Sequence, residues 1–364
     1  MKTKKKAFFL PSLVGGGAER VILNLAIEFA DQGYDVDLIL AKAIGEYLDQ
    51  VPSNINIIDL NSSRVLYSLF PMIQYLKEYK PDSLLSALNH TNIIAICAVL
   101  LANVQTKVFV SVHNQLTQFS TNYSRRFVVK LIPFLMKWSF RKAEKVIAVS
   151  NGVAEDLQRK IKLPQEKIQV IYNPVVDAGL MKKAKEKIDH PWFESSELPV
   201  ILATGRLEAE KDFSSLIQAF ARVRQKKLAK LIILGEGQER EQLEELIESL
   251  GLKDDVWMPG FVVNPYAYMN KADLFVLSSQ YEGLPTVLIE ALACGSEVIS
   301  TDCPSGPREV LQNGQYGLLV QVKDVEGMSQ AIINKLESPI KQNEQAAYQP
   351  FEKKKVFHQY LEIM

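Results

Sequence analysis

Short apolar runs alternate with amphipathic stretches along the first half of the chain. The run 7–10 precedes three glycines at 15–17, and segment 18–32 then carries apolar residues at helical spacing up to Gly33. A strand, a glycine turn and a helix form the opening of a βαβ unit. Later apolar runs predict further strands at 35–40, 83–85, 108–112, 145–149 and 168–172.

The same alternation restarts in the second half. Strands that alternate with helices are typical of a parallel, doubly wound sheet. The expected fold class is therefore α/β, with two Rossmann-like doubly wound domains. In this half the predicted strands cover 200–204, 230–234, 256–258, 274–278 and 298–301, and the predicted helices cover 213–224, 238–250 and 285–293.

A domain boundary is expected near the middle of the chain. Asn173 and Pro174 interrupt the pattern, and a lysine-rich, weakly periodic stretch follows them. A chain of 364 residues also exceeds what one hydrophobic core usually supports. We expect an N-terminal domain at 1–174, a C-terminal domain at 175–348, and a docked terminal helix within 349–364.

The charges are distributed unevenly. They cancel over the whole chain, but Lys and Arg outnumber Asp and Glu before Asn173 and are outnumbered after it. A basic first half suits an anionic membrane or a phosphate-bearing substrate, and scattered solvating lysines are the plainer alternative. Nucleic acid is not among the expected partners.

The cysteines and the first residues bear on where the protein works. Three cysteines without metal-ligand spacing indicate a reducing cytoplasm rather than a disulfide framework. The early lysines and the apolar run 7–14 imitate a secretory signal, but the run is short and contains Pro11, so we interpret it as the buried first strand. No stretch reaches the roughly 18 to 20 apolar residues that a spanning helix needs. We expect a cytoplasmic protein that does not span a bilayer.

The stretch 278–308, SSQYEGLPTVLIEALACGSEVISTDCPSGPR, carries the strongest chemical signal. Pro285 fits the first turn of a helix, and Gly295 fits its C-terminal exit. Glu282 then lies in the loop at the carboxyl end of the preceding strand, and Glu290 lies about a turn and a half inside the helix. The first N–H groups of such a helix form an anion site with the helix dipole, and they belong to Gly283, Leu284, Thr286, Val287 and Leu288.

This arrangement suits a sugar diphosphate donor. The helix N-terminus takes up charge from the leaving pyrophosphate, while one carboxylate accepts sugar hydroxyls and the other accepts ribose hydroxyls. The alternative is that Glu290 is only a polar helix position and Glu282 only complements the helix dipole.

Two cations follow another predicted strand. Arg206 comes directly after strand 200–204, and Lys211 lies five positions beyond it. Two fixed cations at the carboxyl end of a strand neutralise a diphosphate as charge develops on the leaving group. Ordinary surface ion pairs with Glu208 or Glu210 are the alternative.

These motifs together resemble glycosyltransferase family 4, whose members adopt the GT-B fold. The resemblance rests on EGLPTVLIE and GRLEAEK, with support from GGGAER near the start, SVHN at a strand end and the linker IYNPVVD. It covers nearly the whole chain. It implies two Rossmann-like domains that face each other across a cleft, with the C-terminal helix 349–364 returning to the N-terminal domain.

The resemblance also implies roles for individual residues. By the resemblance, His113 faces the donor sugar. The alternative is a structural histidine whose ring nitrogens are hydrogen-bonded within the protein. Catalysis is assigned to His113, Glu282, Arg206 and Lys211. Donor binding is assigned to Arg206 and Lys211 at the diphosphate, Glu282 at the sugar, Glu290 at the ribose, backbone groups of Gly260, Phe261 and Val262 at the base, the helix start at Gly283, Leu284, Pro285, Thr286 and Val287, and the loop of Gly15, Gly16 and Gly17, which phosphate or acceptor approaches closely.

One feature departs from the pattern of related sequences, and another only looks like a known metal-binding motif. Related sequences commonly have a proline near the strand after Gly295, where this chain has Ser296 and Glu297. Asp35 and Asp37 look like the metal-binding DxD of other transferases, but within a strand their side chains point to one face. We expect a structural role for this pair and no catalytic metal.

Segment 123–143 bears on the acceptor. On a helical wheel, one narrow face carries cations and a broad opposite face carries large apolar side chains. Such a helix can lie in a membrane interface against anionic headgroups, and a core-packed surface helix is the alternative. The cations are Arg126, Lys130, Lys137 and Arg141, and the apolar residues are Phe127, Leu131, Phe134, Leu135 and Trp138.

The resemblance therefore predicts a retaining transferase at the inner face of the cell membrane. Its co-substrate is a nucleotide-sugar, preferably a UDP-hexose or UDP-N-acetylhexosamine, and its acceptor is a glycan or a polyprenyl-diphosphate-linked glycan. No cofactor is expected. A nucleotide-sugar epimerase and a non-catalytic nucleotide-sugar-binding partner of another transferase are the alternatives. A nicotinamide dehydrogenase is disfavoured, because Arg20 occupies the third glycine position of a GxGxxG fingerprint.

Overall fold

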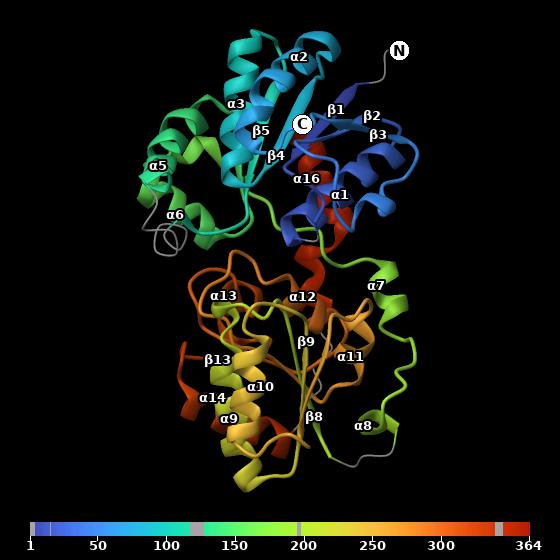
Figure 1. Ribbon diagram of the computed structural model, residues 1–364, viewed down its shortest axis with the longest axis vertical. Coiled ribbons are helices and arrows are strands. Elements are labelled where there is room, and N and C mark those ends of the chain that lie inside the picture. The colour runs from blue at the N-terminus through green and yellow to red at the C-terminus, as the bar shows by residue number, and fades with distance from the viewer. Residues whose placement is uncertain (1–3, 15, 117–126, 195–197, 339–344) are drawn as a thin grey trace. The chain divides into compact units, whose positions relative to one another are not determined.

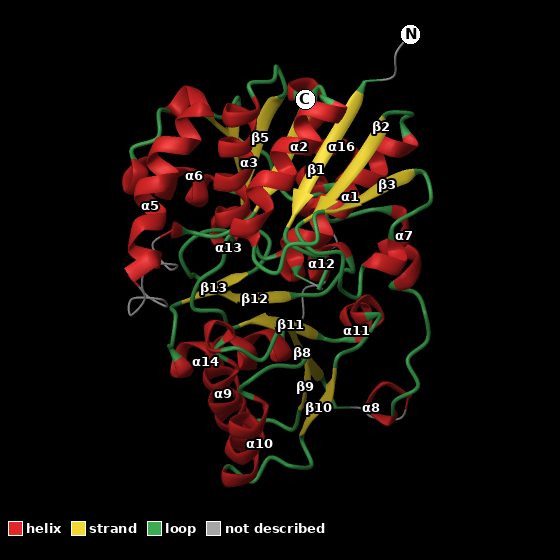
Figure 2. Cartoon of the chain, turned by 45° about the horizontal axis from the view of Figure 1, so that its top comes forward, coloured by secondary structure: helices red, strands yellow, loops and turns green. Residues whose placement is uncertain are grey.

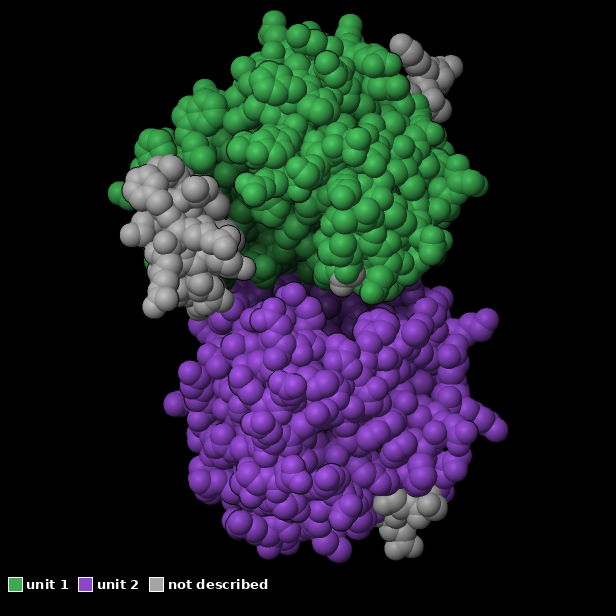
Figure 3. Space-filling model, viewed as in Figure 1, with its two compact units in different colours: residues 1–174, 354–364 green, residues 175–353 purple. Residues whose placement is uncertain are grey.

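The computed structural model describes residues 4–14, 16–116, 127–194, 198–338 and 345–364, excluding the side chains of 127–132. The chain divides into two compact units (Figure 3). Each unit is built around its own parallel sheet. Unit 1 comprises Met1–Pro174 and Lys354–Met364, and unit 2 comprises Val175–Lys353.

Unit 1 contains a seven-stranded sheet in the order β3-β2-β1-β4-β5-β6-β7, with parallel neighbours throughout (Figure 1). The strand order reverses between β1 and β4, and in open α/β sheets ligands bind outside the carboxyl ends of the strands at such a point. The strands are β1 (Lys5–Leu10), β2 (Asp35–Leu40), β3 (Ile55–Asp59), β4 (Ser83–Ala87), β5 (Lys107–Val112), β6 (Lys145–Ala148) and β7 (Ile168–Val170).

Helices cover both faces of this sheet. α1 (Gly17–Asp31) buries an apolar stripe that includes Ile22 and Phe29. Right-handed crossovers run in opposite directions from the reversal point, so α1 lies on one face and the later crossover helices lie on the other. Those later helices pack one beside the next in the order α2 (Leu69–Tyr79), α3 (Asn89–Ala102), α5 (Phe127–Ser139) and α6 (Asn151–Ile161).

The last helix, α16 (Lys353–Ile363), joins the core of unit 1. Phe357 and Tyr360 are buried there, and the rings of Phe357 and Phe29 meet edge-on with centroids 4.8 Å apart. Figure 2 shows α16 close to α1 and β1. The predicted return of the C-terminal helix to the N-terminal domain is confirmed. α16 lies within the expected 349–364, and Gln349–Phe351 form a separate 3-10 turn before it.

Unit 2 contains a six-stranded parallel sheet in the order β10-β9-β8-β11-β12-β13. Its core packs apolar strand residues such as Ile201 and Ile233 against Phe213 and Phe220 of α9. The strands are β8 (Val200–Thr204), β9 (Lys230–Leu234), β10 (Val256–Gly260), β11 (Leu274–Leu277), β12 (Val298–Thr301) and β13 (Leu318–Val320). The helices are α7 (Ala178–Lys183), α8 (Pro191–Glu194), α9 (Phe213–Lys226), α10 (Arg240–Ser249), α11 (Pro265–Lys271), α12 (Thr286–Ala293), α13 (Pro307–Val310), α14 (Val325–Glu337) and α15 (Gln345–Tyr348).

The predicted fold class is confirmed, since both units are parallel α/β sheets of the Rossmann kind. The predicted elements did not include the strands β3 and β13, nor the helices α2, α6, α7, α8, α11, α13, α14 and α15. β3 and β13 are edge strands, and most of their residues are exposed or only partly buried, so they lack the continuous apolar run of a central strand.

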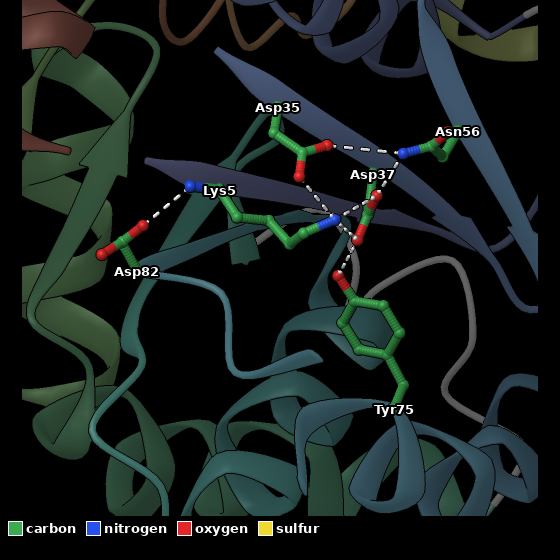
Figure 4. Close-up of polar contacts among 6 residues, drawn as sticks. All are labelled: Lys5, Asp35, Asp37, Asn56, Tyr75 and Asp82. Carbon is green, nitrogen blue, oxygen red and sulfur yellow. Dashed lines mark hydrogen bonds and ion pairs between the residues drawn. The ribbon is translucent and has the colours of Figure 1, made fainter. Parts of the chain in front are cut away.

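A partly buried polar network occupies the start of the unit 1 sheet (Figure 4). The Lys5 Nζ lies 3.0 Å from both Asp35 Oδ2 and Asp37 Oδ2. Asp37 is almost fully buried and also accepts from Asn56 Nδ2 at 3.0 Å and from the Tyr75 hydroxyl at 2.6 Å. The prediction that the DxD-like pair lies in a strand with both carboxylates on one face is confirmed. Its carboxylates serve the packing of β1, β2 and β3.

The predicted amphipathic segment 123–143 corresponds in part to α5, which contains Pro133 and is followed by the 3-10 turn Phe140–Lys142. Residues 123–126 of that prediction lie outside the described residues. Over the described part of the chain, no helix combines the length and apolarity needed to cross a membrane.

Candidate functional site

Lys211 and Glu282 meet at the carboxyl edge of the unit 2 sheet. The Lys211 Nζ lies 2.6 Å from Glu282 Oε1, and both side chains are mostly buried. Ser279 donates its hydroxyl to the same Oε1 at 2.8 Å. Lys211 follows β8 and Glu282 follows β11, which are neighbours in the sheet. The sheet therefore brings together two side chains that are 71 positions apart.

The loops that carry this pair are tied to each other. The Ser278 hydroxyl donates to the Lys211 carbonyl at 2.6 Å, and the Gln280 N–H donates to the Glu210 carbonyl at 2.8 Å. These bonds hold the short 3-10 turn before α9 against the end of β11. The contacts of the Lys211 and Glu210 carbonyls therefore fix the position of this turn, and they keep the Lys211 ammonium close to Glu282.

Arg206 is placed differently. Its guanidinium is 73% exposed and lies 3.6 Å from Glu210. The surface ion pair considered for Arg206 is therefore present, whereas Lys211 pairs with Glu282 instead of with Glu208 or Glu210. An exposed pair of this kind contributes little to stability, so Arg206 can leave it for a ligand at small cost.

The start of α12 borders the pair. Pro285 is the residue before the helix, with φ −73° and ψ 92°, and Leu284 is buried. Gly306, with φ +93°, packs so closely on Pro285 that a side chain there would overlap the proline ring. The Ser305 hydroxyl donates to the Gly283 carbonyl at 2.9 Å. The loop is thereby held at the head of α12.

One predicted anion donor at this helix start is corrected. The Leu288 N–H donates to the Pro285 carbonyl at 3.1 Å, so it is occupied within the turn. Thr286 and Val287 are the first two residues of the helix, where N–H groups have no partner within the helix itself. The N–H groups that remain for the predicted anion site are therefore fewer than the sequence indicated.

Two thiols near the glutamates stay protonated. Burial, and then the charge of Glu282, raise the pKa of Cys303 to about 12. Burial, and then the charge of Glu290 on α12, raise the pKa of Cys294 to about 12. Neither thiol is a nucleophile at neutral pH, so the polar chemistry of this edge belongs to the carboxylates and cations.

The segment predicted to hold the base follows β10. Gly260 has φ +90° and accepts the Gly235 N–H on its carbonyl at 2.8 Å. A side chain at Gly260 would crowd the Glu236 carboxylate. Phe261 is 71% exposed and Val262 is partly exposed. The exposed Phe261 ring is available for an aromatic ligand, whereas Gly260 is buried and its carbonyl already accepts a hydrogen bond.

His113 lies in unit 1, just beyond β5. Its Nε2 is 3.0 Å from the hydroxyl of the fully buried Ser111. The residue keeps part of its surface exposed, while the surrounding protein desolvates the ring and lowers its pKa to about 4. The imidazole is therefore neutral at physiological pH.

The predicted glycine loop is also in unit 1, and Gly15 lies outside the described residues. The Gly16 N–H donates to Glu19 Oε2 at 2.9 Å, which caps α1. At Gly17, an added Cβ would meet no atom within 4 Å. The open space over Gly17 permits a close approach of a ligand to the start of α1.

The departure at Ser296 and Glu297 has a local explanation. The Ser296 hydroxyl donates to the Met269 carbonyl at 2.5 Å, and the Glu297 carboxylate lies 2.9 Å from Lys335 Nζ of α14. These contacts tie the start of β12 to α11 and α14. The change affects packing at the amino end of the sheet.

Ser278, Ser279 and Gln280 were not among the predicted site residues, but they contact the loops that carry Lys211 and Glu282. They follow β11 directly, and Ser279 contacts Glu282. Short polar residues at the carboxyl end of a central strand were the available signal, since ligands bind there. Serine pairs are common in loops, so this signal alone would not have identified them.

The two parallel sheets and their covering helices define the class of fold, which is GT-B. Anabaena HepE in complex with UDP has a TM-score of 0.78 at 20% identity over 98% of each chain. Sucrose-phosphate synthase from Thermosynechococcus elongatus has a TM-score of 0.82 at 19% identity, covering 99% of this chain and 98% of that one. These likenesses establish the GT-B fold.

Sequence comparison establishes the family. Residues 15–178 match the family described as "Glycosyltransferase Family 4", and residues 184–350 match "Glycosyl transferases group 1". The N-acetylgalactosamine-N,N'-diacetylbacillosaminyl-diphospho-undecaprenol 4-alpha-N-acetylgalactosaminyltransferase of Campylobacter jejuni is 33% identical over 349 residues, covering 92% of this chain and 90% of that protein. The chain therefore belongs to glycosyltransferase family 4, as its motifs predicted.

A second Campylobacter jejuni relative is less similar. It is a GalNAc-alpha-(1->4)-GalNAc-alpha-(1->3)-diNAcBac-PP-undecaprenol alpha-1,4-N-acetyl-D-galactosaminyltransferase, 28% identical over 335 residues, covering 88% of this chain and 85% of that protein. The protein is accordingly a glycosyltransferase.

Proposed function

We propose that the protein is a retaining transferase that moves a hexose or N-acetylhexosamine from a UDP-sugar to a lipid-linked glycan. The contact between Lys211 and Glu282 carries the donor half of this proposal. A lysine and a glutamate held together beside a helix N-terminus offer a cation for phosphate and a carboxylate for sugar hydroxyls.

Each group has a stated task in the donor complex. Lys211 and Arg206 neutralise the diphosphate as charge develops on it, and Thr286 and Val287 offer backbone N–H groups to the same charge. Glu282 accepts hydroxyls of the sugar. Glu290 accepts the ribose hydroxyls, and the backbone at 260–262 binds the base. The roles of His113 and the glycine loop remain those that the family resemblance implies.

Retention follows from the family resemblance. The donor bond loosens, and the acceptor hydroxyl attacks from the same face while the leaving phosphate helps to remove its proton. Charge on the leaving diphosphate is balanced by Lys211, Arg206 and the α12 N-terminus, so we propose that no metal is needed. The carboxylates of Asp35 and Asp37 are already committed to Lys5. Transfer at an undiminished rate in a chelator is the expected result.

The acceptor proposal rests on the relatives and on α5. Both Campylobacter jejuni relatives carry names of transferases that act on undecaprenol-linked glycans. On α5, Phe134, Leu135 and Trp138 are exposed by 69, 42 and 50%, next to the exposed Lys137. Exposed aromatic residues beside a cation suit a membrane interface better than the core-packed alternative. We therefore propose peripheral contact with the inner face of the cell membrane.

The alternatives differ in what they consume. An epimerase converts a nucleotide-sugar without any acceptor, and a binding partner converts nothing. Membership of a transferase family favours transfer over both, because transfer is the activity in the names of the relatives.

A donor screen followed by product analysis tests the proposal. Thermal shifts with UDP-, GDP- and ADP-sugars rank the donors, because a ligand that binds the native state stabilises it by mass action. We expect a UDP-sugar to give the largest shift and to be consumed only when a polyprenyl-diphosphate glycan is added. NMR of the product is expected to show the donor's anomeric configuration. An inverted anomer, or turnover without acceptor, would refute the mechanism.

A further inference from the structure

An exposed apolar patch lies at the start of α2 in unit 1. Its members, Leu66, Tyr67 and Phe70, are exposed by 67, 58 and 75%. Leu66 and Tyr67 belong to the 3-10 turn Val65–Ser68, and α2 follows this turn directly. Phe70 is the second residue of α2, so it lies within about one helical turn of both. Large apolar side chains gathered in this way on a surface mark a binding site.

The patch is confined to the first turn of α2. Farther along the helix, Met72, Tyr75 and Leu76 are buried and form the stripe that faces the core. On the outer side of the same stretch, Gln74 and Lys77 are exposed. Packing of α2 on the sheet therefore does not account for the exposed apolar residues at its start.

Backbone bonds place this turn at the carboxyl edge of the sheet. The Ala41 N–H, just after β2, donates to the Leu10 carbonyl of β1 at 3.0 Å, and the Ser62 N–H, after β3, donates to the Ala41 carbonyl at 2.7 Å. The turn that follows packs against α3, which lies beside α2 (Figure 1). Ligands of open α/β sheets bind at the carboxyl ends of the strands, so the patch is on the ligand-binding side of unit 1.

Arg64 adds a cation to the patch. It is exposed, it immediately precedes the turn, and its carbonyl accepts the Tyr67 N–H at 2.9 Å. Within the described ranges of the chain, the Arg64 guanidinium has no hydrogen-bond or ion-pair partner. An unpaired guanidinium has the fork of donors that suits a phosphate. The patch therefore combines an apolar surface with one free phosphate-binding cation.

We infer that this turn binds the lipid anchor of the acceptor, with the polyprenyl chain on Leu66, Tyr67 and Phe70 and the diphosphate at Arg64. The inference rests on the proposed function, in which the acceptor is a polyprenyl-diphosphate glycan. In such a lipid the charged diphosphate is joined directly to an apolar chain, just as Arg64 adjoins the patch. A single cation matches one diphosphate, whereas segments that bind anionic bilayers carry several. The position also fits, because the glycan is attached to the diphosphate and is then held at the edge where ligands bind.

Binding of farnesyl diphosphate tests the inference without any transfer. This probe is a short prenyl diphosphate that carries no glycan, and saturating UDP keeps its diphosphate out of the donor site. Isothermal titration calorimetry should show that it binds about a hundredfold more tightly than inorganic diphosphate, because the prenyl chain covers the apolar patch. Equal affinities for the two compounds would overturn the inference.

Variants separate the apolar contact from the ionic one. Phe70→Ser and Leu66→Ser should each weaken farnesyl diphosphate about tenfold and leave inorganic diphosphate unchanged. Arg64→Gln should weaken both compounds about tenfold. The matched controls Leu101→Ser, 61% exposed on α3, and Lys77→Gln, in the last turn of α2, should bind like the wild type. Wild-type affinity in folded Phe70→Ser and Leu66→Ser would overturn the inference, and circular dichroism verifies the fold of each variant.

Transfer separates this inference from the proposed function. With a polyprenyl-diphosphate glycan in detergent, Phe70→Ser should raise KM about tenfold at an unchanged kcat. A benzyl glycoside of the same glycan lacks both lipid and diphosphate, so Phe70→Ser and the wild type should use it equally. A wild-type protein that binds farnesyl diphosphate as expected but transfers no sugar would contradict the proposed function alone. An active transferase whose KM is the same in Phe70→Ser would contradict the inference alone.

Two results would assign the patch to a different occupant and overturn the inference. Loss of flotation with anionic vesicles in Phe70→Ser, at an unchanged affinity for farnesyl diphosphate, would assign the patch to the bilayer surface. A dimer in light scattering that Phe70→Ser dissociates, again at unchanged affinity, would assign it to a second copy of this chain. The expected result is a loss of farnesyl diphosphate affinity with flotation and molar mass unchanged.

Discussion

Replacing the two aspartates of β2 one at a time distinguishes a structural pair from a metal-binding one. The Asp37 side chain is 2% exposed and accepts from Lys5, Asn56 and Tyr75, whereas Asp35 is 39% exposed (Figure 4). Asp37→Asn removes the buried charge and leaves Lys5 with its weaker, more exposed partner. Breaking a buried ion pair costs about 3–5 kcal/mol, and an exposed pair contributes about 1 kcal/mol or less.

The expected result is a large difference between the two variants. Lys5 keeps Asp35, so the lower end of that range, about 3 kcal/mol, applies to Asp37→Asn. For a unit of this size it corresponds to a fall of roughly 6–12 °C in the unfolding midpoint. Scanning calorimetry should show that fall for Asp37→Asn and a change of no more than about 4 °C for Asp35→Asn. Transfer by the folded variants should persist.

Two outcomes would refute this reasoning. Loss of transfer in Asp37→Asn at an unchanged midpoint would indicate a metal or catalytic carboxylate. Equal destabilisation by both variants would show that burial does not separate them. Tyr75 offers a second readout, since burial and the bond to Asp37 raise the pKa of its phenol. Asp37→Asn should let that tyrosine titrate at a lower pH.

Three further predictions follow from unit 1. Gly17→Ala should raise the free energy of unfolding by about 0.5–1 kcal/mol, because residue 17 is helical and an added Cβ meets no atom. The same substitution should lower the transfer rate, because a ligand is expected to approach the backbone at this position. An unchanged rate would contradict a close contact between ligand and backbone at Gly17. Burial lowers the pKa of His113 to about 4, whereas a histidine in the unfolded chain has a pKa near 6.5, so the unfolded chain binds the proton first as the pH falls. The free energy of unfolding should therefore drop by up to about 3 kcal/mol between pH 6.5 and 4. Denaturant curves of His113→Gln should lack this pH-dependent loss of stability. Phe134→Ser with Trp138→Ser should reduce flotation with anionic vesicles, with Leu228→Ser on unit 2 as the exposed control; equal flotation would count against contact through α5.

The alternation of apolar runs predicted the central strands because parallel strands are buried on both faces and read as continuous apolar segments. It gave no signal for β3, whose residues are mostly exposed, or for β13, an edge strand of the unit 2 sheet whose residues are exposed or partly buried. Helix ends were less certain, as at α12, where the predicted helix includes Pro285 but the observed helix begins at Thr286.

The site was predicted unevenly for a related reason. Residue type and strand ends indicated Lys211 and Glu282, since ligands bind where strands end. Their direct contact depends on β8 and β11 being neighbours, and strand order is not visible in local patterns. The hydrogen bond from Ser279 to Glu282 and the bond from the Leu288 N–H to the Pro285 carbonyl depend on loop conformation, which local sequence does not determine. The orientation of Arg206 toward Glu210 was one of the alternatives left open.

The transfer rate of Glu282→Gln tests the central claim most directly. The amide keeps the size of the side chain but removes the charge that pairs with Lys211 and, in our account, accepts sugar hydroxyls. With folding verified by calorimetry, kcat should fall by about a hundredfold or more, while UDP alone still raises the unfolding midpoint. The matched variant Glu210→Gln, whose carboxylate pairs only with the exposed Arg206 among the described residues, should stay within about threefold of wild type. A Glu282→Gln enzyme that transfers sugar at the wild-type rate would contradict the account.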